Sequence, residues 1–365
     1  MEDLATAQAK RGHQVRVLTI DRDLVGGDPR RLAAHEIHRG VDVLRVPAVG
    51  TSRKQFATGS YDDILTSLRT AAVVHHHDPR FLFELTSAVR RLGGRPVIFH
   101  THGLIWHTDR FAALKQLVSR WYYGPMLRHV VDVVIADSDA DADRLAASAH
   151  VDGAKVRVLR NAIDLTRFAE IRRAPQDGLI ASYGRLDTHK GLDRLLAALP
   201  EVELPWRLEV AGTGPDDLVQ RLAGMARSLG IADRVTWLGR ISDDALDGLL
   251  ARAALLAFPS RSEGFGLALL ETLAAGAPVL ASDIPSHREV LGPGLLDRLA
   301  DFEDPSELAS RISAALAAPE DPSIGERARA RAATFGHNDL VDALEGIYAE
   351  LGLRPATQSA STSTA

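Results

Sequence analysis

The chain has 365 residues, which is too long for one ordinary hydrophobic core and suits two domains. Its 45% hydrophobic and 25% charged residues are typical of a soluble globular protein, and the net charge of −5 excludes a general surface for nucleic acid or other polyanions. The absence of cysteine excludes disulfides, thiolate catalysis and cysteine-ligated metal, and the lack of a long apolar run or a signal-peptide pattern predicts a cytoplasmic protein.

Short apolar runs alternate with helical patterns through most of the chain, which predicts an α/β protein with parallel sheets. The runs in the first half are 14–20, 41–46, 71–77, 95–101, 132–138 and 155–161. Those in the second half are 178–184, 206–212, 234–239, 254–260 and 277–282, with helical patterns such as 192–199 and 216–229 between them. Two open sheets in series place a ligand at the carboxyl ends of the strands, in a cleft between the domains.

The ends and the middle of the chain set the predicted domain limits. The polar segment 168–178, which contains Pro175, predicts a linker, so the domains are expected at 1–167 and 168–337. The tail 352–365 is rich in Ser, Thr and Ala and is expected to be disordered. The chain opens with an amphipathic helix that ends at Gly12, whereas a doubly wound domain ordinarily opens with a strand and a glycine-rich turn. The sequence therefore predicts that the first strand is missing.

The segment "SEGFGLALLETLAAGAPVLAS", residues 262–282, predicts a loop after a strand, followed by a helix. Gly264, Phe265 and Gly266 then lie at the helix N-terminus, where free backbone amides favour an anion such as a diphosphate. Glu263 would repel a phosphate, so we expect it to accept hydrogen bonds from neutral hydroxyls. Glu271 faces nearly the same direction and suits a second pair of hydroxyls. Taken alone, however, two glutamates at this spacing are more often structural, with Glu263 as an N-cap partner and Glu271 as an ordinary exposed helix residue.

The segment "SYGRLDTHKGLDRLLAAL" predicts a strand that ends near Gly184 and a helix that begins near Leu192. Arg185 and Lys190 fall in the loop between them, where a planar guanidinium and a compact ammonium suit phosphate oxygens. Two solvated basic residues beside a turn would give the same pattern. The nearby "VAGTGP" lacks the third glycine of a dinucleotide fingerprint, so it gives little support to an NAD enzyme.

Histidines gather in two places, at residues 75–77 and at His100, His102 and His107. Because no acidic cluster accompanies them in the sequence, we predict no metal. His102, which precedes Gly103 at a strand end, is expected to point into the cleft from the N-terminal domain.

The segment from Arg80 to Arg128 is basic within an acidic protein. Its eight basic residues against Glu84 and Asp109 give a local net charge of 8 − 2 = +6, and aromatic residues are interleaved with them. This pattern suits an anionic membrane surface or a lipid-diphosphate acceptor. A solvated helix face with core aromatics is the alternative.

Seven segments, taken in order along the chain, resemble the retaining GT-B glycosyltransferases of family 4, whose members include bacterial α-mannosyltransferases. They are "RGHQVRVLT" (11–19), "HTHG" (100–103), "VIADS" (134–138), "VRVLRNAIDLTRF" (156–168), "GRLDTHKG" (184–191), "VAGTGP" (210–215) and "PSRSEGFGLALLETLAAGAPVLASDIPSHREVLGPG" (259–294). The resemblance implies a GT-B fold, with two Rossmann-like doubly wound domains that face a cleft. It also implies that a helix at 338–351 returns to the N-terminal domain.

The resemblance implies a role for each site residue. Arg185 and Lys190 would bind the diphosphate of a nucleotide sugar, Glu271 the ribose hydroxyls, and Glu263 with the backbone of 264–267 the transferred sugar. His102 would approach that sugar from the other domain, and Ser138 and Asn161 would form the cleft wall. The implied donor-binding set is Gly184, Arg185, Lys190, Glu263, Gly264, Phe265, Gly266, Leu267 and Glu271, and the implied catalytic set is His102, Glu263, Arg185 and Lys190.

The chemistry implied is transfer of a hexose with retention of the anomeric configuration. Electrostatic stabilisation of the departing diphosphate by Arg185, Lys190 and the helix N-terminus would replace a metal, and no cofactor is expected. No residue is placed as a nucleophile, so the preferred hypothesis is front-face attack in which the leaving phosphate takes the acceptor's proton. "VDVLRVPAVGTSRK" and "HTHGLIWHT" favour a mannosyltransferase that uses GDP-mannose and extends a polyprenyl-diphosphate-linked glycan, with peripheral contact to the inner face of the membrane.

Three alternatives remain open at the level of sequence. The first is a nucleotide-sugar-binding relic without catalysis, because the glycine-rich loop of the first strand approaches the donor and acceptor in the family. The second is a transferase that uses a UDP-sugar. The third is an epimerase of the same fold, which would convert the donor without an acceptor.

Overall fold

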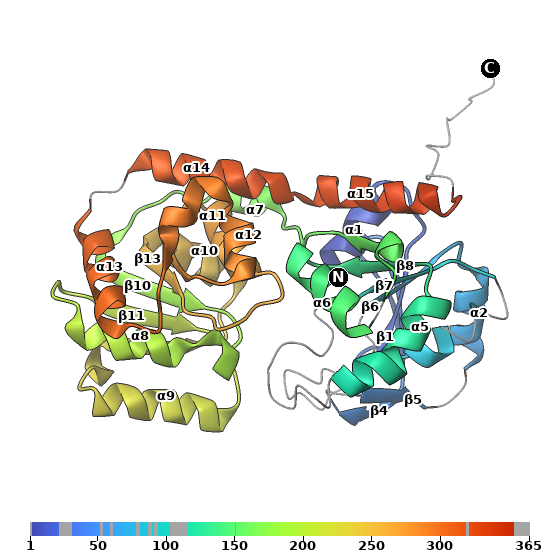
Figure 1. Cartoon of the computed structure of the whole chain (residues 1–365), viewed down its shortest axis with the longest axis horizontal. Coiled ribbons are helices and arrows are strands. Elements are labelled where there is room, and N and C mark those ends of the chain that lie inside the picture. Colours follow the sequence, from blue (N-terminus) through green and yellow to red (C-terminus); the bar gives the residue numbers. More distant parts are fainter. Residues whose placement is uncertain are drawn as a thin grey trace, which may run out of the picture. The chain divides into compact units, whose positions relative to one another are not determined.

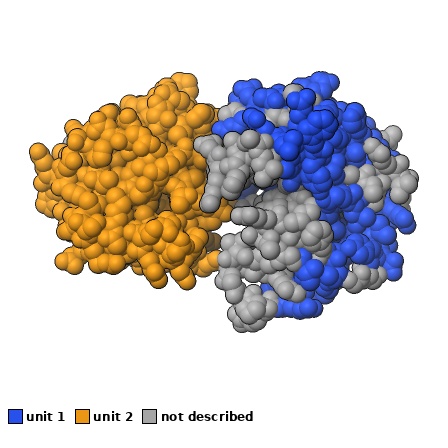
Figure 2. Space-filling view, turned by 60° about the horizontal axis from the view of Figure 1, so that its bottom comes forward, with its two compact units in different colours: residues 1–160, 337–365 blue, residues 161–336 orange. Residues whose placement is uncertain are grey.

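A computed structural model describes residues 2–21, 31–51, 54–58, 61–77, 81–86, 90, 94–102, 116–149, 151–318 and 321–353. The chain divides into two compact units (Figure 2). The N-terminal unit comprises residues 1–160 and 337–365, and the C-terminal unit comprises residues 161–336.

The division between the units falls at Asn161 rather than after residue 167. Ile163, Phe168 and Ile171 are buried in the core of the C-terminal unit, and a short helix, α7 (Leu165–Ala169), covers this stretch. The predicted linker at 168–178 is therefore wrong. Phe168 and Ile171 are surrounded by polar residues in the sequence, so the sequence did not reveal that these two side chains are buried.

The strands of the C-terminal unit are β10 (Gln176–Tyr183), β11 (Arg207–Ala211), β12 (Val235–Gly239), β13 (Ala253–Phe258), β14 (Val279–Ser282) and β15 (Leu299–Ala300). They form one parallel sheet in the order β12-β11-β10-β13-β14-β15. Numbered within the unit, this is the 3-2-1-4-5-6 order of a doubly wound sheet. The order reverses between β10 and β13, so a ligand site is expected at the carboxyl ends of these two strands.

Helices cover both faces of this sheet (Figure 1). Beside α7, they are α8 (Leu192–Ala198), α9 (Asp216–Ser228), α10 (Asp243–Arg252), α11 (Leu267–Ala274), α12 (Pro285–Leu291), α13 (Pro305–Ala317) and α14 (Pro322–Ala332). Successive residues of β10 point to opposite faces: Leu179 and Ala181 pack with α10, α11, α12 and α14, whereas Ile180 packs with α8, α9 and α13. Burial on both faces explains why the strands of this unit are continuous apolar runs in the sequence.

The strands of the N-terminal unit are β1 (Arg16–Ile20), β2 (His35–His38), β3 (Val41–Val46), β4 (Ala48–Thr51), β5 (Lys54–Ala57), β6 (Val74–His77), β7 (Val97–His100), β8 (Val133–Ala136) and β9 (Val156–Val158). Strands β6, β7, β8 and β9 form a parallel sheet in that order. Among the described residues, β1 and β3 pair in parallel in a separate sheet, to which β2 adds an antiparallel edge, and β4 and β5 form an antiparallel pair. The sequence did not predict these antiparallel additions.

Within the described part of the N-terminal unit, the helical segments are α1 (Glu2–Lys10), α2 (Asp62–Thr70), η1 (Ser119–Tyr123), α5 (Gly124–His129), α6 (Asp139–Ala149), η2 (Gly153–Lys155) and α15 (His337–Glu350). Helices α1 and α15 pack together on the face of the β6–β9 sheet that carries Ile98 and Ile135. Gln8 donates a hydrogen bond to the hydroxyl of Tyr348 across this contact, at 2.7 Å. The helix that the resemblance implies at 338–351 thus belongs to the N-terminal unit, although it lies at the end of the chain.

None of the helices in the described ranges is both long and apolar enough to cross a bilayer.

Candidate functional site

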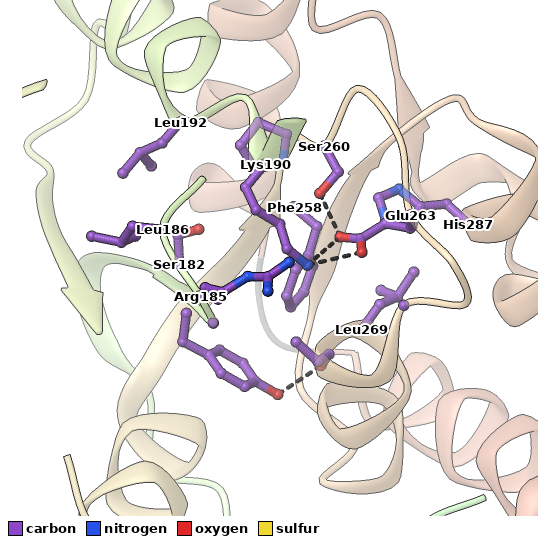
Figure 3. A pocket seen from close by; sticks show the side chains of 15 residues that line it. Ser182, Arg185, Leu186, Lys190, Leu192, Phe258, Ser260, Glu263, Leu269 and His287 are labelled. Atoms are coloured by element: carbon purple, nitrogen blue, oxygen red, sulfur yellow. Dashed lines mark hydrogen bonds and ion pairs between the residues drawn. The ribbon is translucent and has the colours of Figure 1, made fainter. Parts of the chain in front are cut away.

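A pocket opens at the carboxyl ends of β10 and β13, where the strand order reverses (Figure 3). The residues that line it are Ser182, Tyr183, Gly184, Arg185, Leu186, Lys190, Leu192, Phe258, Pro259, Ser260, Glu263, Gly266, Ala268, Leu269 and His287. Five of the residues predicted from the sequence are among them: Gly184, Arg185, Lys190, Glu263 and Gly266. The pocket lies wholly within the C-terminal unit.

Lys190 and Glu263 contact each other directly in this pocket. The Lys190 Nζ lies 2.7 Å from Glu263 Oε1 and 2.8 Å from Oε2, and Ser260 Oγ donates to Oε1 at 2.7 Å. Burial raises the pKa of Glu263, but the Lys190 ammonium and the Ser260 hydroxyl outweigh it and hold the pKa below its usual value. Glu263 is therefore a carboxylate at neutral pH. The sequence assigned these two residues to separate parts of a ligand and did not predict that they form an ion pair.

The loop that carries Lys190 is fixed from the other side of the pocket. Lys190 ends a short 3₁₀ helix, η3 (Thr188–Lys190), and Arg261 donates to Thr188 O at 3.1 Å and to both carboxylate oxygens of Asp193 at 2.8 and 2.7 Å. A guanidinium that makes a two-pronged pair of this kind restricts the loop to one geometry. Arg185 lies two residues after the end of β10, lines the pocket and is exposed, so its guanidinium is open to a ligand.

The N-terminus of α11 closes one side of the pocket. Gly266 precedes this helix with φ 106°, a left-handed conformation that favours glycine, and it has no side chain to cap the first turn. The first backbone amides of a helix lack intrahelical acceptors, so they are donors for an anion. Of the other predicted residues here, Phe265 is buried in the core at 3% exposure and Leu267 is 43% exposed. Phe265 therefore anchors the loop, and only its backbone can serve a ligand.

Glu271 is joined to the pocket through Tyr183. The Tyr183 hydroxyl lies 3.2 Å from Glu271 Oε2, 2.6 Å from Ala268 O and 3.1 Å from Thr272 Oγ1. Burial raises the pKa of Glu271 above its usual value, although the hydrogen bond from Tyr183 opposes this. Tyr183 ends β10 and lines the pocket, so it sets the position of a carboxylate that lies 88 residues later in the chain.

His287 is a pocket residue that the sequence analysis missed. It lies on α12 and is buried, and its Nδ1 lies 2.9 Å from the carbonyl oxygen of Ser282, so the ring donates from Nδ1 and Nε2 is left as an acceptor. The ring packs under Gly266: a methyl group added there would lie 3.5 Å from His287 Cδ2. The sequence offered one signal for His287: the segment "SHRE" follows closely after the predicted strand at 277–282, at the same edge of the sheet as the glycine-containing loop.

The remaining predicted residues lie elsewhere. His102 and Ser138 belong to the N-terminal unit, and Asn161 is the first residue of the C-terminal unit. Ser138 is buried and its Oγ accepts from Asp141 N at 3.1 Å, so it stabilises the start of α6. His102 has φ 44°, a left-handed conformation that is strained for a non-glycine residue, and its Nε2 lies 2.9 Å from His77 Nδ1.

An aspartate lies beside the histidines in the structure. The sequence analysis predicted no metal because it found no acidic residues near the histidines, and this premise is wrong. His100 Nε2 lies 2.8 Å from Asp137 Oδ1, and His102 Nδ1 lies 3.6 Å from the same oxygen. Burial raises the pKa of Asp137, but the hydrogen bonds from the two imidazoles outweigh it, so the net pKa lies below its usual value. Asp137 follows β8, and only the pairing of β7 with β8 brings it to His100.

Part of the basic segment 80–128 serves the fold. Arg90 donates to both oxygens of Asp132 at 2.9 and 2.7 Å, and Arg128 donates to Ala149 O at 2.7 Å. Other residues of this interpretation, with His107 and Gly103 of the histidine motif, lie outside the described residues: Arg80, Arg91, Trp106, Asp109, Arg110, Phe111 and Lys115.

Both halves of the chain match known families. Residues 1–167 match the family described as Glycosyltransferase Family 4, and residues 166–332 match the family described as Glycosyl transferases group 1. The chain is 32% identical over 286 residues to the GDP-mannose:cellobiosyl-diphosphopolyprenol alpha-mannosyltransferase of Xanthomonas oryzae pv. oryzae. The aligned region covers 76% of this chain and 72% of that protein. It is 29% identical over 293 residues to the enzyme of the same name from Komagataeibacter xylinus, with 78% and 72% covered.

Solved structures show the same fold. Anabaena Alr3699/HepE in complex with UDP-glucose superposes with a TM-score of 0.73 at 18% identity, with 95% of each chain covered. Sucrose-phosphate synthase from Thermosynechococcus elongatus gives a TM-score of 0.74 at 21% identity, with 96% of this chain and 92% of that chain covered.

The fold and the pocket therefore define a glycosyltransferase of the GT-B class, which takes a hexose from a nucleotide sugar. Within that class, the chain belongs to glycosyltransferase family 4. The sequence-based prediction of family and fold class is confirmed.

Proposed function

We propose that this glycosyltransferase moves mannose from GDP-mannose to a glycan linked to polyprenyl diphosphate, with retention of the anomeric configuration. The observation that carries this proposal is the Lys190–Glu263 pair at the N-terminus of α11, where a cation and a carboxylate share one pocket. The names of the relatives that are 29–32% identical support mannose as the sugar and a diphosphopolyprenol acceptor.

The hydrogen-bonding capacity of the pair suits both parts of a sugar diphosphate. An ammonium has three donors, and Lys190 directs two of them to Glu263, so one remains for a phosphate oxygen. The Oε2 of Glu263 accepts from Lys190 and has a second acceptor site for a sugar hydroxyl. Arg185 and the amides of α11 add positive charge for the diphosphate, and Glu271 offers its carboxylate to the ribose hydroxyls.

In the transfer step, the bond between the anomeric carbon and the diphosphate oxygen breaks. The acceptor hydroxyl attacks the anomeric carbon on the face of the sugar from which the diphosphate departs. The leaving phosphate takes the acceptor's proton. Negative charge that develops on the diphosphate is stabilised by Lys190, Arg185 and the helix N-terminus, and this stabilisation grows in the transition state.

The first prediction concerns the donor. We expect GDP-mannose at one hundred times its Kd to stabilise the protein by about 2.7 kcal/mol, which raises the melting temperature by roughly 5–10 °C. UDP-glucose should give a smaller shift at the same concentration. Thermal shift measures binding, and release of GDP in the presence of a diphosphopolyprenol-linked disaccharide measures transfer.

The outcomes separate the alternatives. A larger shift with UDP-glucose than with GDP-mannose would assign the donor to the UDP-sugars. Binding without transfer or donor hydrolysis would indicate the relic, and conversion of the donor's sugar without any acceptor would indicate the epimerase. No shift with either donor at millimolar concentration would contradict the proposed function.

We also propose that the segment 116–123 of the N-terminal unit contacts the membrane that carries the lipid-linked acceptor. Leu117 and Trp121 are 55% and 69% exposed and lie four residues apart in a continuous helical stretch, with exposed Arg120 between them. Exposed aromatic and aliphatic side chains beside a cation suit the interface of an anionic bilayer.

The second prediction tests this surface. Trp121→Ala should lower the partition coefficient onto phosphatidylglycerol-containing vesicles, measured by flotation, by at least about tenfold, because burial of one large apolar side chain contributes about 1.5–3 kcal/mol. The matched control is Ile37→Ser, which removes a 66% exposed apolar side chain from β2 of the same unit. Equal flotation of wild type and Trp121→Ala would contradict the proposed surface.

A further inference from the structure

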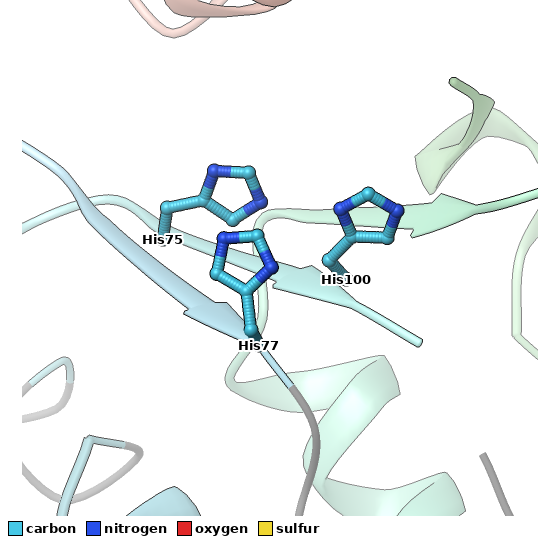
Figure 4. Close-up of side chains that lie close together, drawn as sticks. All are labelled: His75, His77 and His100. Atoms are coloured by element: carbon cyan, nitrogen blue, oxygen red, sulfur yellow. The ribbon is translucent and has the colours of Figure 1, made fainter. Parts of the chain in front are cut away.

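Three histidines lie together on one face of the β6–β9 sheet (Figure 4). His75 and His77 alternate along β6 and so point to the same side, and His77 is paired in register with His100 of β7. The ring centroids of His75 and His77 are 4.2 Å apart, and those of His77 and His100 are 5.3 Å apart. Figure 4 shows ring nitrogens of all three residues turned toward the space between them.

Two ring nitrogens of this cluster lack partners. His75 Nε2 and His100 Nδ1 are buried, and neither has a hydrogen-bond partner. An unsatisfied buried polar atom costs about 1–3 kcal/mol, so two of them in one cluster require an explanation. A metal-ligand atom from each of His75, His77 and His100 lies within 4.8 Å of the other two.

The second ring nitrogen of His100 has the partner that a metal ligand ordinarily has. Its Nε2 lies 2.8 Å from the carboxylate of Asp137, which fixes the tautomer so that Nδ1 carries the lone pair. A histidine whose outer nitrogen donates to a carboxylate is the usual arrangement behind a metal-bound imidazole. This contact is independent of the unpartnered nitrogens, and both observations indicate the same kind of ligand.

We propose that His75, His77 and His100 bind one divalent transition-metal ion, with Asp137 as the residue that orients His100. At a tetrahedral ion with bonds of about 2.0–2.1 Å, the ligand nitrogens lie roughly 3.3 Å apart, and the three histidines here offer ligand atoms within 4.8 Å of one another. Imidazole ligands favour Zn²⁺, Cu²⁺ or Ni²⁺ over Mg²⁺ or Ca²⁺, which prefer oxygen. Three protein ligands leave a fourth position for water, as in open zinc sites.

None of the three ligands lines the donor pocket: they are residues of the N-terminal unit, whereas the donor residues belong to the C-terminal unit. His102 lies beside this cluster, because its Nε2 is 2.9 Å from His77 Nδ1.

The third prediction is that the chelator-stripped full chain without a polyhistidine tag binds one Zn²⁺ per chain. Competition with a fluorescent zinc chelator gives the affinity, and Co²⁺ as a probe gives the absorption bands of a tetrahedral site. His75→Gln and His77→Gln should each weaken Zn²⁺ binding by at least about a hundredfold, and Asp137→Asn by about 10–100-fold. Mg²⁺ at the same concentration should not compete.

His35→Gln is the matched control, because His35 is an exposed histidine of β2 in the same unit, with its Nε2 2.6 Å from Asp42 Oδ1. Its Zn²⁺ affinity should equal that of wild type, and circular dichroism checks that each variant is folded. Two results would overturn the proposal. One is wild-type protein that binds less than one Zn²⁺ per chain at micromolar concentrations. The other is binding that survives in folded His75→Gln and His77→Gln.

Discussion

Replacing Lys190 by methionine is expected to lower kcat/KM for hexose transfer by about 10²–10³-fold, most of it in kcat. The reason is that the ammonium is proposed to stabilise charge that develops on the leaving diphosphate, and removal of one such preorganised group costs about 3–4 kcal/mol of transition-state stabilisation. Methionine keeps the length and apolar stem of the side chain without the charge. Steady-state kinetics with saturating acceptor measures the effect.

The ion pair supplies an internal control for this experiment. Lys190→Met alone leaves Glu263 as an unpaired, largely buried carboxylate, so the melting temperature should fall as well. The double variant Lys190→Met with Glu263→Gln removes both charges and should recover much of the melting temperature while transfer stays lost. Activity that returns together with stability would show that Lys190 serves only the fold.

Replacing Glu271 by glutamine is expected to raise the KM for the donor by about 10–100-fold and to raise the inhibition constant of GDP by the same factor. Hydrogen bonds to a charged acceptor contribute about 1.5–3 kcal/mol, and the ribose that Glu271 is proposed to hold is present in GDP as well as in the sugar nucleotide. Inhibition by GDP therefore reports on the ribose contact without the sugar. The effect should differ in kind from that of Lys190→Met, which acts on kcat.

Two further variants serve as comparisons for Glu271→Gln. Tyr183→Phe removes the hydroxyl that lies 3.2 Å from Glu271 Oε2, so it should give a smaller loss in the same direction. Glu326→Gln changes an exposed glutamate on α14 and should leave both constants unchanged. A Glu271→Gln enzyme whose GDP inhibition is unaltered would exclude the ribose role.

Five strands of the C-terminal unit, β10 to β14, were predictable because most of their residues are at least partly buried and they appear as mainly apolar runs. Those that the sequence missed are short or exposed. β2 has the sequence "HEIH", forms an antiparallel edge and is mostly exposed, and β15 has two residues. A period-two apolar pattern needs a buried face and several residues, so neither strand leaves one in the sequence. The boundary at Asn161 was missed because it depends on a few buried residues in a polar stretch.

The sequence by itself determined the family, the alternation of strands and helices, and the two loops that carry Arg185, Lys190 and Glu263, because these depend on local patterns and their order. Only the tertiary structure decided which side chains meet. Lys190 and Glu263 are 73 residues apart and pair because β10 and β13 are adjacent at the reversal of the sheet. Asp137 joins the histidines because β8 lies beside β7. Contacts of this kind depend on strand order and register, which a linear pattern of residue types does not specify.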